Sequence, residues 1–537
     1  MIFNSRRSTV YGFHGMVAAS QPLAVEAGLK ILRAGGNAVD AAVAVAAVLN
    51  VTEPCSCGIG GDMFALYFDN SKNDVIGING SGRSPKDLSF GKIKAEGING
   101  LSLPELHPFT VTVPGAVAGF LDLLEKYGTK ERREVFSTAI TLAREGFPVS
   151  PITSLFWAKN KYQLLNGLNA NELLLNGEAP KAGQLMRNVT LANSFEQIVE
   201  YGKDAFYKGK IAEEIVSAIQ SKGGVLSMED LASHKSEWTK PIFVDYHDKR
   251  IHEIPPNGQG LTALLALNIL EEIDFKYIEH LSAKYFHTVI DAMRLAFADT
   301  RYYIADQEKV KVPVEELLSK SYAQKRRMLL NPNKAVIDVV KGSPFASSDT
   351  VYFATADGEG NACSFTFSNY NGFGTGIIPK GCGFSLQNRG ANFSLEEGHP
   401  NIYEPNKRPY HTIIPGMVTY TDNNKLYGPF GVMGAFMQPQ GHVQVLLNMF
   451  EYNMNPQQAL DAPRFCINDG NGGGAVSLEE GIPISVMSEL VAKGHTIQPV
   501  SGHGRAIFGR GQIIRKISQN IYEAGSDPRA DGLALGF

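Results

Sequence analysis

The sequence predicts an α+β protein in which helices dominate before about residue 340 and short strands dominate after residue 350. Two patterns carry this prediction. Apolar and small residues recur at helical spacing in segment 22–34 and in several later segments. After residue 350, short runs rich in β-branched and aromatic residues alternate with glycine turns. At 537 residues, the chain is long enough for two to four folding units.

The N-terminal region predicts two helices separated by a glycine turn. Segment 22–34 places its apolar residues on one helical face, and Gly35 and Gly36 follow it as a left-handed cap. Segment 38–49 is rich in small residues, so we expect a buried helix that packs closely on a sheet. A glycine-rich segment at 111–119 predicts a turn from a strand into a helix.

The later elements follow the same two periodicities. The remaining helices are expected at 133–144, 212–220, 262–273, 283–299 and 441–452, the last beginning after Pro439. Strands are expected at 63–68, 242–246, 336–340, 350–356, 362–368, 384–387, 413–420 and 427–433. The polar segment 341–349 has no periodicity, which is typical both of a processing linker and of a plain interdomain loop.

Composition excludes several classes of protein. The net charge is −4, from 50 basic and 54 acidic residues, and no basic run is longer than three residues, so nothing indicates a nucleic-acid partner. We find no signal peptide and no apolar run long enough to cross a membrane. The five cysteines lack the spacing of a disulfide framework or a zinc site. We therefore expect buried, reduced cysteines, a cytoplasmic location, and neither a metal nor a cofactor.

Thr350 stands at the first position of a predicted hairpin. If 357–361 forms a five-residue turn, facing residues have numbers that sum to 718, so Ser368 lies opposite Thr350. Thr366 lies opposite Tyr352, on the same face. Facing Cβ atoms are about 4.5–5.5 Å apart, which is close enough for Ser368 to orient the Thr350 hydroxyl.

Such a threonine becomes a nucleophile if the chain is cut between Asp349 and Thr350. The new α-amino group, with an unperturbed pKa of about 7.7–8.0, then serves as the base for the neighbouring hydroxyl. Threonine and serine pairs also occur on many hairpins without any catalytic role. Spacing alone therefore leaves both interpretations open.

Seven motifs together resemble the γ-glutamyltransferase family of N-terminal-nucleophile hydrolases, over nearly the whole chain. They begin at His14 (HGMVAASQPLA), Gly35 (GGNAVDAA), Gly58 (GIGGD), Thr112 (TVPGAVAGF), Thr350, Lys407 (KRP) and Asp461 (DAPRF). The resemblance implies a four-layer αββα fold and autocleavage between Asp349 and Thr350. It implies a large fragment of residues 1–349 and a small fragment of residues 350–537, which together form one catalytic unit. Their expected masses are about 38 and 20 kDa, in proportion to the 58.3 kDa chain.

The resemblance also assigns roles to individual positions. Thr350 matches the nucleophile, and Ser368 matches a supporting hydroxyl. Arg83 matches the arginine that grips the substrate carboxylate. Gly434 and Ala435 stand where two glycines donate N–H groups to the oxyanion, a role that Ala435 can fill if its backbone conformation suits a residue with a Cβ atom.

Other positions depart from the γ-glutamyl pattern. Asn392 replaces an aspartate that binds the substrate ammonium, and Arg389 replaces a glutamine. His411 and Thr412 replace two serines. These residues and Thr366 are candidate substrate contacts, and segment 395–405 is short for a lid. The neutral amide of Asn392 and the added guanidinium of Arg389 disfavour a substrate with a free ammonium group and favour an acyl group that carries a negative charge.

The expected activity is a self-processing hydrolysis or transfer of γ-glutamyl-type amides through a Thr350 acyl-enzyme, with hydrolysis favoured. One alternative is an amidase for dicarboxylic or oxamate-like acyl groups without the amine, and a second is an inactive binding scaffold. Arg389 could instead pair with a structural carboxylate, and His411 could be a structural histidine. The expected partners are a small carboxylate-bearing amide and the two fragments themselves, with no membrane; a homo-oligomer remains open.

Overall fold

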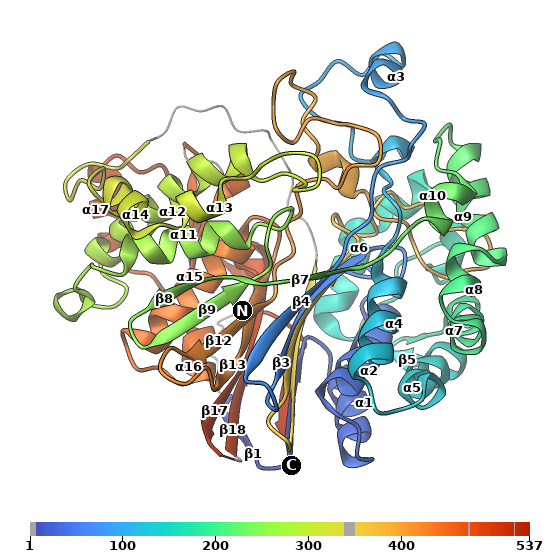
Figure 1. Cartoon of the computed structure of the whole chain (residues 1–537), viewed down its shortest axis with the longest axis horizontal. Coiled ribbons are helices and arrows are strands. Elements are labelled where there is room, and N and C mark those ends of the chain that lie inside the picture. Colours follow the sequence, from blue (N-terminus) through green and yellow to red (C-terminus); the bar gives the residue numbers. More distant parts are fainter. Residues whose placement is uncertain (1–6, 338–349, 471–472, 520) are drawn as a thin grey trace.

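The computed structural model describes residues 7–337, 350–470, 473–519 and 521–537. Two seven-stranded sheets lie face to face in the middle of the molecule, and every neighbouring pair of strands in them is antiparallel (Figure 1). Sheet I contains, in order, β1 (Val10–Gly12), β18 (Ile521–Ser526), β17 (Arg510–Ser518), β13 (Leu426–Met433), β12 (Gly416–Tyr420), β9 (Lys249–Glu253) and β8 (Ile242–Tyr246). Sheet II contains β19 (Leu533–Gly536), β2 (Gly15–Ala19), β10 (Val351–Asp357), β11 (Ala362–Ser368), β3 (Asp62–Asp69), β4 (Asp74–Gly80) and β7 (Glu237–Thr239).

Helices cover the outer face of each sheet, so the layers run helix, sheet, sheet, helix (Figure 1). The helices on the sheet II side are α1 (Pro22–Arg33), α2 (Ala38–Thr52), α4 (Ala116–Tyr127), α5 (Arg132–Glu145), α6 (Pro151–Asn166), α7 (Val189–Tyr201), α8 (Lys203–Tyr207), α9 (Lys210–Ser221) and α10 (Met228–Ala232). Those on the sheet I side are α11 (Gly260–Leu270), α12 (Ala283–Tyr303), α13 (Val314–Leu317), α14 (Lys320–Arg327), α15 (Met437–Phe450), α16 (Pro456–Asp461) and α17 (Ile484–Ala492). The sequence prediction of a mixed α and β fold is therefore confirmed.

Smaller elements complete the described chain. They are α3 (Phe90–Ala95), a three-stranded sheet of β14 (Phe465–Ile467), β15 (Val476–Glu479) and β16 (Ile497–Val500), and a pair formed by β5 (Phe147–Pro148) and β6 (Leu185–Met186). Short 3-10 turns include η4 (Arg389–Asn392) and η6 (Gly502–Phe508).

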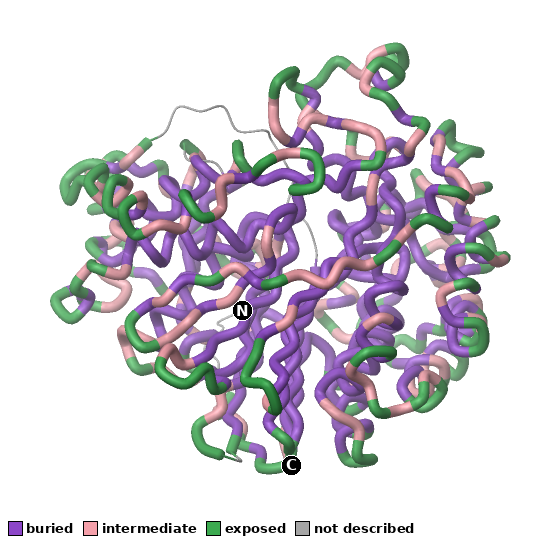
Figure 2. The backbone as a smooth tube through the Cα atoms, in the orientation of Figure 1, coloured by how far each residue is buried: buried purple, intermediate pink, exposed green. Residues whose placement is uncertain are grey.

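Apolar side chains fill three layers of core. One lies between the two sheets, where Phe64 and Tyr352 of sheet II meet Met417 of sheet I. The other two lie between each sheet and its helices. Figure 2 shows the strands and the inner helices as almost continuously buried, whereas exposure concentrates in the outer loops. Groups at the ends of the central strands are therefore held by packing on every side.

Helix α2 illustrates how the local sequence produces these buried elements. Asn37 accepts hydrogen bonds from the N–H groups of Val39 and Asp40, and the Asp40 carboxylate accepts one from the N–H of Asn37. This capping box satisfies N–H groups that the first helical turn leaves without partners. All fifteen residues of α2 are buried, as the small-residue pattern predicts.

The β10–β11 hairpin has the predicted register. Val351 pairs with Phe367, Tyr352 with Thr366 and Ala356 with Ala362, so the residue numbers sum to 718. The two strands lie beside each other within sheet II, between β2 and β3. Strand β10 is therefore paired with β11 along residues 351–356 and with β2 along residues 354–357.

Four predicted elements differ from the structure. The strand expected to lead into the helix at 111–119 is absent, because residues 111–115 belong to no strand and α4 begins at Ala116. Segment 384–387 is not a strand, because its N–H groups bond to loops, as when Leu386 donates to the Ile377 carbonyl. In the predicted strand 336–340, residues 336 and 337 belong to no strand. Residues 338–349, which include the predicted linker and Asp349, lie outside the described residues. The helix predicted at 441–452 is α15, which begins earlier, at Met437, and includes Pro439. The first turn of a helix tolerates proline because the N–H groups there have no helical acceptor in any case.

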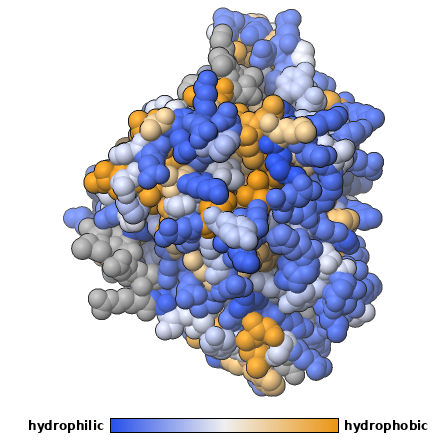
Figure 3. Space-filling model, turned by 90° about the vertical axis from the view of Figure 1, so that its left-hand side faces the viewer, coloured by the Kyte–Doolittle hydropathy of each residue, from blue (hydrophilic) through white to orange (hydrophobic). Residues whose placement is uncertain are grey.

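The face on the left-hand side of Figure 1 is mostly hydrophilic, with separate small hydrophobic patches (Figure 3). The exposed apolar residues of the described chain include Met328 and Ile484. Isolated apolar residues of this kind are normal on protein surfaces. Within the described part of the chain, no helix is both long enough and apolar enough to span a membrane.

Candidate active site

Thr350 and Ser368 form the centre of the site. The Thr350 hydroxyl donates to Ser368 Oγ at 3.1 Å, and both residues are fully buried. Ser368 Oγ also accepts the N–H of Tyr370 at 2.8 Å, which holds it in place. Because the Thr350 hydrogen points to Ser368, the lone pairs of Thr350 Oγ1 are oriented away from it. The predicted contact across the hairpin is confirmed.

A buried ion pair lies on the backbone side of Thr350. Arg510 on β17 donates to Glu53 at 2.7 Å and to the Thr350 carbonyl oxygen at 3.4 Å. Glu53 also accepts from Ser20 and Ser56. Burial raises the pKa of Glu53, and the Arg510 charge opposes that rise. Glu53 is therefore held in a buried network of hydrogen bonds and one ion pair.

Gly434 and Ala435 follow β13 in a tight left-handed turn. Their φ angles are 125° and 48°. The Gly434 carbonyl accepts from Met437 N, and the Ala435 carbonyl accepts from Gln259 Nε2 at 2.7 Å. These contacts fix the peptide planes that follow Gly434 and Ala435, and the first of these planes carries the Ala435 N–H. A left-handed conformation costs an alanine about 1–2 kcal/mol, so Ala435 keeps its N–H at a local energetic cost.

This turn is close to the nucleophile. Arg510 Nε contacts Met433 Sδ at 3.4 Å, while its Nη2 group reaches the Thr350 carbonyl. Met433 immediately precedes Gly434. The Arg510 side chain thus links the Thr350 carbonyl to the end of β13, and Gly434 and Ala435 directly follow that end.

Arg389 is completely buried beside these groups. Its Nη1 donates to Thr412 Oγ1 at 2.7 Å, and its guanidinium lies 4.6 Å from the ring centroid of Tyr370. Among the described residues, its Nε and Nη2 atoms have no hydrogen-bond partner. Burial lowers the pKa of Arg389 to about 10, partly opposed by Asp62, so the side chain stays charged near neutral pH.

Several neutral polar groups near Arg389 also lack partners within the described structure. They are the side-chain amides of Asn371 and Asn392, the hydroxyl of Tyr370 and Oγ1 of Thr366. Unsatisfied buried polar groups are costly, and a cluster of them marks a place where a polar ligand binds. Of the predicted set, the structure joins Thr350 to Ser368 and Arg389 to Thr412, while Thr366 and Asn392 have side-chain groups without a partner in the described part of the chain.

Arg83 is placed differently. Its guanidinium forms a 2.5 Å ion pair with Glu308, and the side chain is 26% exposed. The Arg83 backbone contacts residues near the site. The Arg83 carbonyl accepts a hydrogen bond from the Val113 N–H, and the N–H of the preceding residue, Gly82, donates to Asp62. To bind a substrate carboxylate, Arg83 must first release Glu308.

His411 is engaged with Asp62. The Ile413 N–H donates to His411 Nδ1, so His411 Nε2 carries the proton and donates to Asp62 Oδ2 at 3.0 Å. Burial lowers the pKa of His411, with a smaller effect of Arg389. Burial raises the pKa of Asp62 to about 7, although Arg389 and hydrogen bonds from Gln387 and two backbone groups oppose this. These contacts give His411 a positioning role and leave Asp62 no free cation site.

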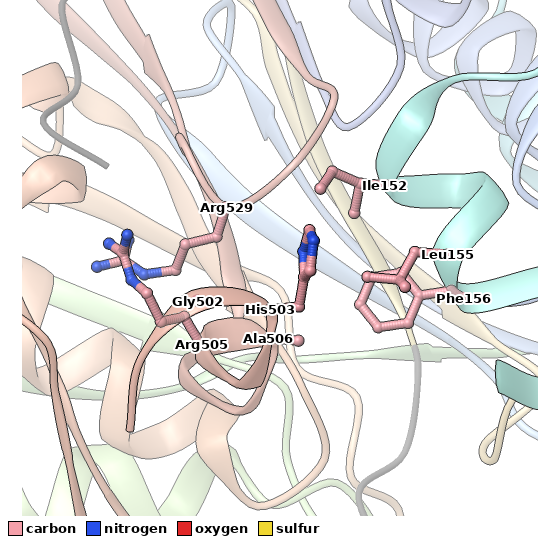
Figure 4. Close-up of a pocket in the computed structure, with 8 residues that line it drawn as sticks. All are labelled: Ile152, Leu155, Phe156, Gly502, His503, Arg505, Ala506 and Arg529. Atoms are coloured by element: carbon pink, nitrogen blue, oxygen red, sulfur yellow. The ribbon is translucent and has the colours of Figure 1, made fainter. Parts of the chain in front are cut away.

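A small cavity is lined by Phe156, His503 and Arg529, among other residues (Figure 4). It has a volume of about 20 Å³ and lies between α6 and η6, with Leu155 and His503 on opposite sides. A water needs about 10–15 Å³ of such space. The cavity can hold a water but no acyl substrate.

Sequence reasoning missed Arg510, Gln259 and Tyr370. Arg510 reaches Thr350 across 160 positions, and Gln259 reaches Ala435 across 176. No local motif points to either residue. Tyr370 has a left-handed φ of 77°, which a tyrosine seldom adopts. No pattern in the sequence predicts this conformation.

Comparisons with known proteins identify related sequences and structures over nearly the whole chain. Residues 24–537 match the family described as Gamma-glutamyltranspeptidase. The chain is 36% identical to the glutathione hydrolase-like YwrD proenzyme of Bacillus subtilis, covering 98% of this chain and 99% of that protein. It is 29% identical to the oxamate amidohydrolase proenzyme of Klebsiella pneumoniae, with 98% of both chains covered. The crystal structure of a cephalosporin acylase from Bacillus halodurans matches with a TM-score of 0.93 and 42% identity, over 100% of this chain and 98% of that one.

Proposed function

Because the chain belongs to the gamma-glutamyltranspeptidase family, we propose that it is the precursor of an N-terminal-nucleophile amidohydrolase that cuts itself before Thr350. The observation that carries the proposal is the 3.1 Å hydrogen bond from the Thr350 hydroxyl to Ser368 at the buried start of β10. The names of the relatives support the processing step, since the YwrD and oxamate amidohydrolase relatives are both called proenzymes.

In the processed enzyme, the free α-amino group of Thr350 takes the hydroxyl proton while Oγ1 attacks the amide carbon. The N–H groups of Gly434 and Ala435 donate to the oxygen that becomes negative. The carbon–nitrogen bond then breaks, and the amine leaves with the proton. Water hydrolyses the resulting ester and restores Thr350. Loop 395–405 is short and bonded to Leu101, so we expect water to be the main acceptor.

The acyl group of the preferred substrate carries a carboxylate and no amine. Arg389 supports this proposal, because its free Nε and Nη2 atoms form the fork that binds a carboxylate with two parallel hydrogen bonds. Asn392 supplies no negative charge for an ammonium group. Oxamate, which gives one relative its name, is itself an amide whose acyl group bears a carboxylate and no amine.

A γ-glutamyl substrate is the second candidate, and the glutathione hydrolase-like relative favours it. It requires a carboxylate for the substrate ammonium. Glu105 is a candidate for this role because its backbone carbonyl accepts a hydrogen bond from the side chain of Asn388, the residue before Arg389. With this substrate, Arg389 or a released Arg83 would bind the α-carboxylate.

The test combines processing with substrate choice. N-terminal sequencing of the purified chain is expected to find a fragment that begins Thr-Val-Tyr-Phe. Hydrolysis of glutaryl-p-nitroanilide is then compared with hydrolysis of γ-glutamyl-p-nitroanilide, in the native chain and in Glu105→Gln. A glutaryl preference supports the amine-free substrate, whereas a γ-glutamyl preference that Glu105→Gln abolishes supports the second candidate. An uncut chain without amidase activity would instead identify a binding scaffold.

A further inference from the structure

Three metal-ligating side chains meet in the helical layer outside sheet I, away from Thr350. His287 and Asp291 lie one turn apart on α12, and His495 lies between α17 and β16. Their exposed fractions are 4%, 1% and 3%. The helices α12 and α17 are neighbours at the left of Figure 1. Two imidazoles and a carboxylate so deeply buried call for a partner that satisfies them.

A hydrogen bond to the backbone fixes the orientation of the His287 ring. Its Nε2 donates to the carbonyl oxygen of Asn331 at 2.7 Å, so Nδ1 carries the lone pair. This Nδ1 atom lies 2.8 Å from His495 Nε2 and 3.6 Å from Asp291 Oδ2. A histidine that ligates a metal usually donates its other N–H to a carbonyl or carboxylate in this manner.

The internal hydrogen bonds do not satisfy the cluster. Asp291 Oδ2 accepts the Val336 N–H at 3.1 Å, but Asp291 Oδ1 has no hydrogen-bond partner among the described residues. His495 Nδ1 likewise has none in that part of the chain. Asp291 Oδ1 can therefore join Oδ2 as a ligand, whereas His495 Nδ1 would carry the N–H when Nε2 binds a metal.

We propose that His287, Asp291 and His495 bind a divalent transition-metal ion, with Zn²⁺ the first candidate. Ligands of a tetrahedral Zn²⁺ are about 2.0–2.1 Å from the metal and hence about 3.4 Å from one another. The 3.6 Å pair already has this spacing, and the 2.8 Å histidine pair must open by about 0.6 Å, which a small rotation of His495 provides. A water completes the fourth position.

The surrounding charges select among metals. Arg294 lies near the Asp291 carboxylate and donates to the Gly474 carbonyl, while Lys493 donates to the Pro332 carbonyl. Both cations oppose a further positive ion. Ions held mainly by charge, such as Ca²⁺ and Mg²⁺, are therefore disfavoured, whereas imidazole nitrogens favour Zn²⁺, Ni²⁺ and Cu²⁺.

The site would join the two fragments of the processed enzyme. His287 and Asp291 belong to residues 1–349, and His495 belongs to residues 350–537. This consequence rests on the proposed function, but binding of the metal itself does not. Metal binding can therefore be tested on an uncut chain, and its failure would leave the proposed catalysis intact.

The experiment uses the full chain after removal of any purification tag, because polyhistidine binds Zn²⁺. The protein is incubated with Zn²⁺, separated by gel filtration and measured by atomic emission for bound zinc. We expect one Zn²⁺ per chain and a higher melting temperature, and Co²⁺ in place of Zn²⁺ should give the visible absorption of a tetrahedral centre. Circular dichroism checks that each variant is folded.

Asp291→Asn and His495→Gln should each weaken Zn²⁺ affinity at least tenfold, measured by titration calorimetry. The exposed His503 provides the matched control, since His503→Gln should retain one Zn²⁺ per chain. If the native chain retains no zinc, or if folded His495→Gln retains as much as the native chain, the proposal is wrong. If a variant does not fold, the zinc content and Co²⁺ spectrum of the native chain still decide the outcome.

Discussion

Arg510 donates to the carbonyl oxygen of Thr350 at 3.4 Å while it is ion-paired with Glu53 at 2.7 Å. The carbonyl belongs to the residue that would begin the small fragment after scission. Because Glu53 belongs to the loop after α2, this pair ties the new chain start to the other side of the cut. The backbone of Thr350 can therefore stay in place when its amino side is released.

Removing Arg510 should destabilise the protein strongly. Arg510→Met leaves Glu53 buried without its counter-charge, which typically costs about 3–5 kcal/mol. We expect the free energy of unfolding, measured with urea, to fall by this amount. In the double variant with Glu53→Gln, much of the loss should be recovered, because no buried charge remains. Strictly additive losses would contradict a direct ion pair.

Thr350→Ala should give an uncut and inactive chain, because the hydroxyl that starts both reactions is absent. Thr350→Ser keeps a hydroxyl and should still be cut, more slowly. Denaturing electrophoresis after timed incubation measures both rates. Thr355→Ser is the control, since Thr355 lies on the same strand but donates to the Ala38 carbonyl on the opposite face. Normal cutting of Thr350→Ala would refute the assignment.

Ser368→Ala should reduce kcat/KM about fivefold in processed enzyme. The loss of one orienting hydrogen bond is worth about 1 kcal/mol, and tenfold in rate corresponds to about 1.4 kcal/mol. Ser368→Thr, which keeps the hydroxyl, should recover most of the rate. Rates are compared per cut chain, so that slow processing is not counted as slow catalysis. Equal activity of the alanine and threonine variants would show that the hydroxyl has no role.

The hairpin could be predicted because its determinants are local. The turn at 357–361 and the alternating side chains on both sides fix one register, and a shift by one residue would turn Thr350 to the opposite face. Segment 384–387 has a similar strand-like composition. It is not a strand because its partners are loops such as Gly60, which lies more than 300 residues away in the chain.

The site residues that carry out the chemistry could be predicted. The residues that hold them in place, such as Arg510 and Gln259, were missed because they are distant in the sequence. Arg389, Asn392 and Thr412 were found through the family resemblance. Their unpaired donors and acceptors could not be predicted, because burial and pairing depend on how η4 packs in the folded chain. Arg83 has the expected residue type, yet its ion pair with Glu308 depends on a loop more than 200 residues later.

Arg389→Leu should raise KM for a carboxylate-bearing anilide at least tenfold and leave kcat less affected. The carboxylate would lose a charge-assisted, two-bond contact worth about 1.5–3 kcal/mol per hydrogen bond to a charged group. Arg389→Lys should restore part of the affinity, because it keeps the charge but not the fork. Steady-state kinetics with glutaryl-p-nitroanilide and with uncharged butyryl-p-nitroanilide separate the two effects. An equal rise in KM for both anilides would indicate general damage to the site.

Acid should weaken the C-terminal core through Asp527. Burial alone would raise the pKa of this carboxyl, but Arg464 and Arg529 outweigh it and hold the pKa at about 2. The unfolded value is about 3.9, so Asp527 contributes about 2–3 kcal/mol that is fully present above pH 4. This stability is lost as the pH falls from about 4 to 2, because the unfolded chain then binds the proton first. Urea unfolding at pH 7, 4 and 3 should show the decline in the native chain, whereas Asp527→Asn should be less stable at pH 7 and lose less between pH 4 and 3. A parallel decline in both chains would assign the acid sensitivity to other carboxylates.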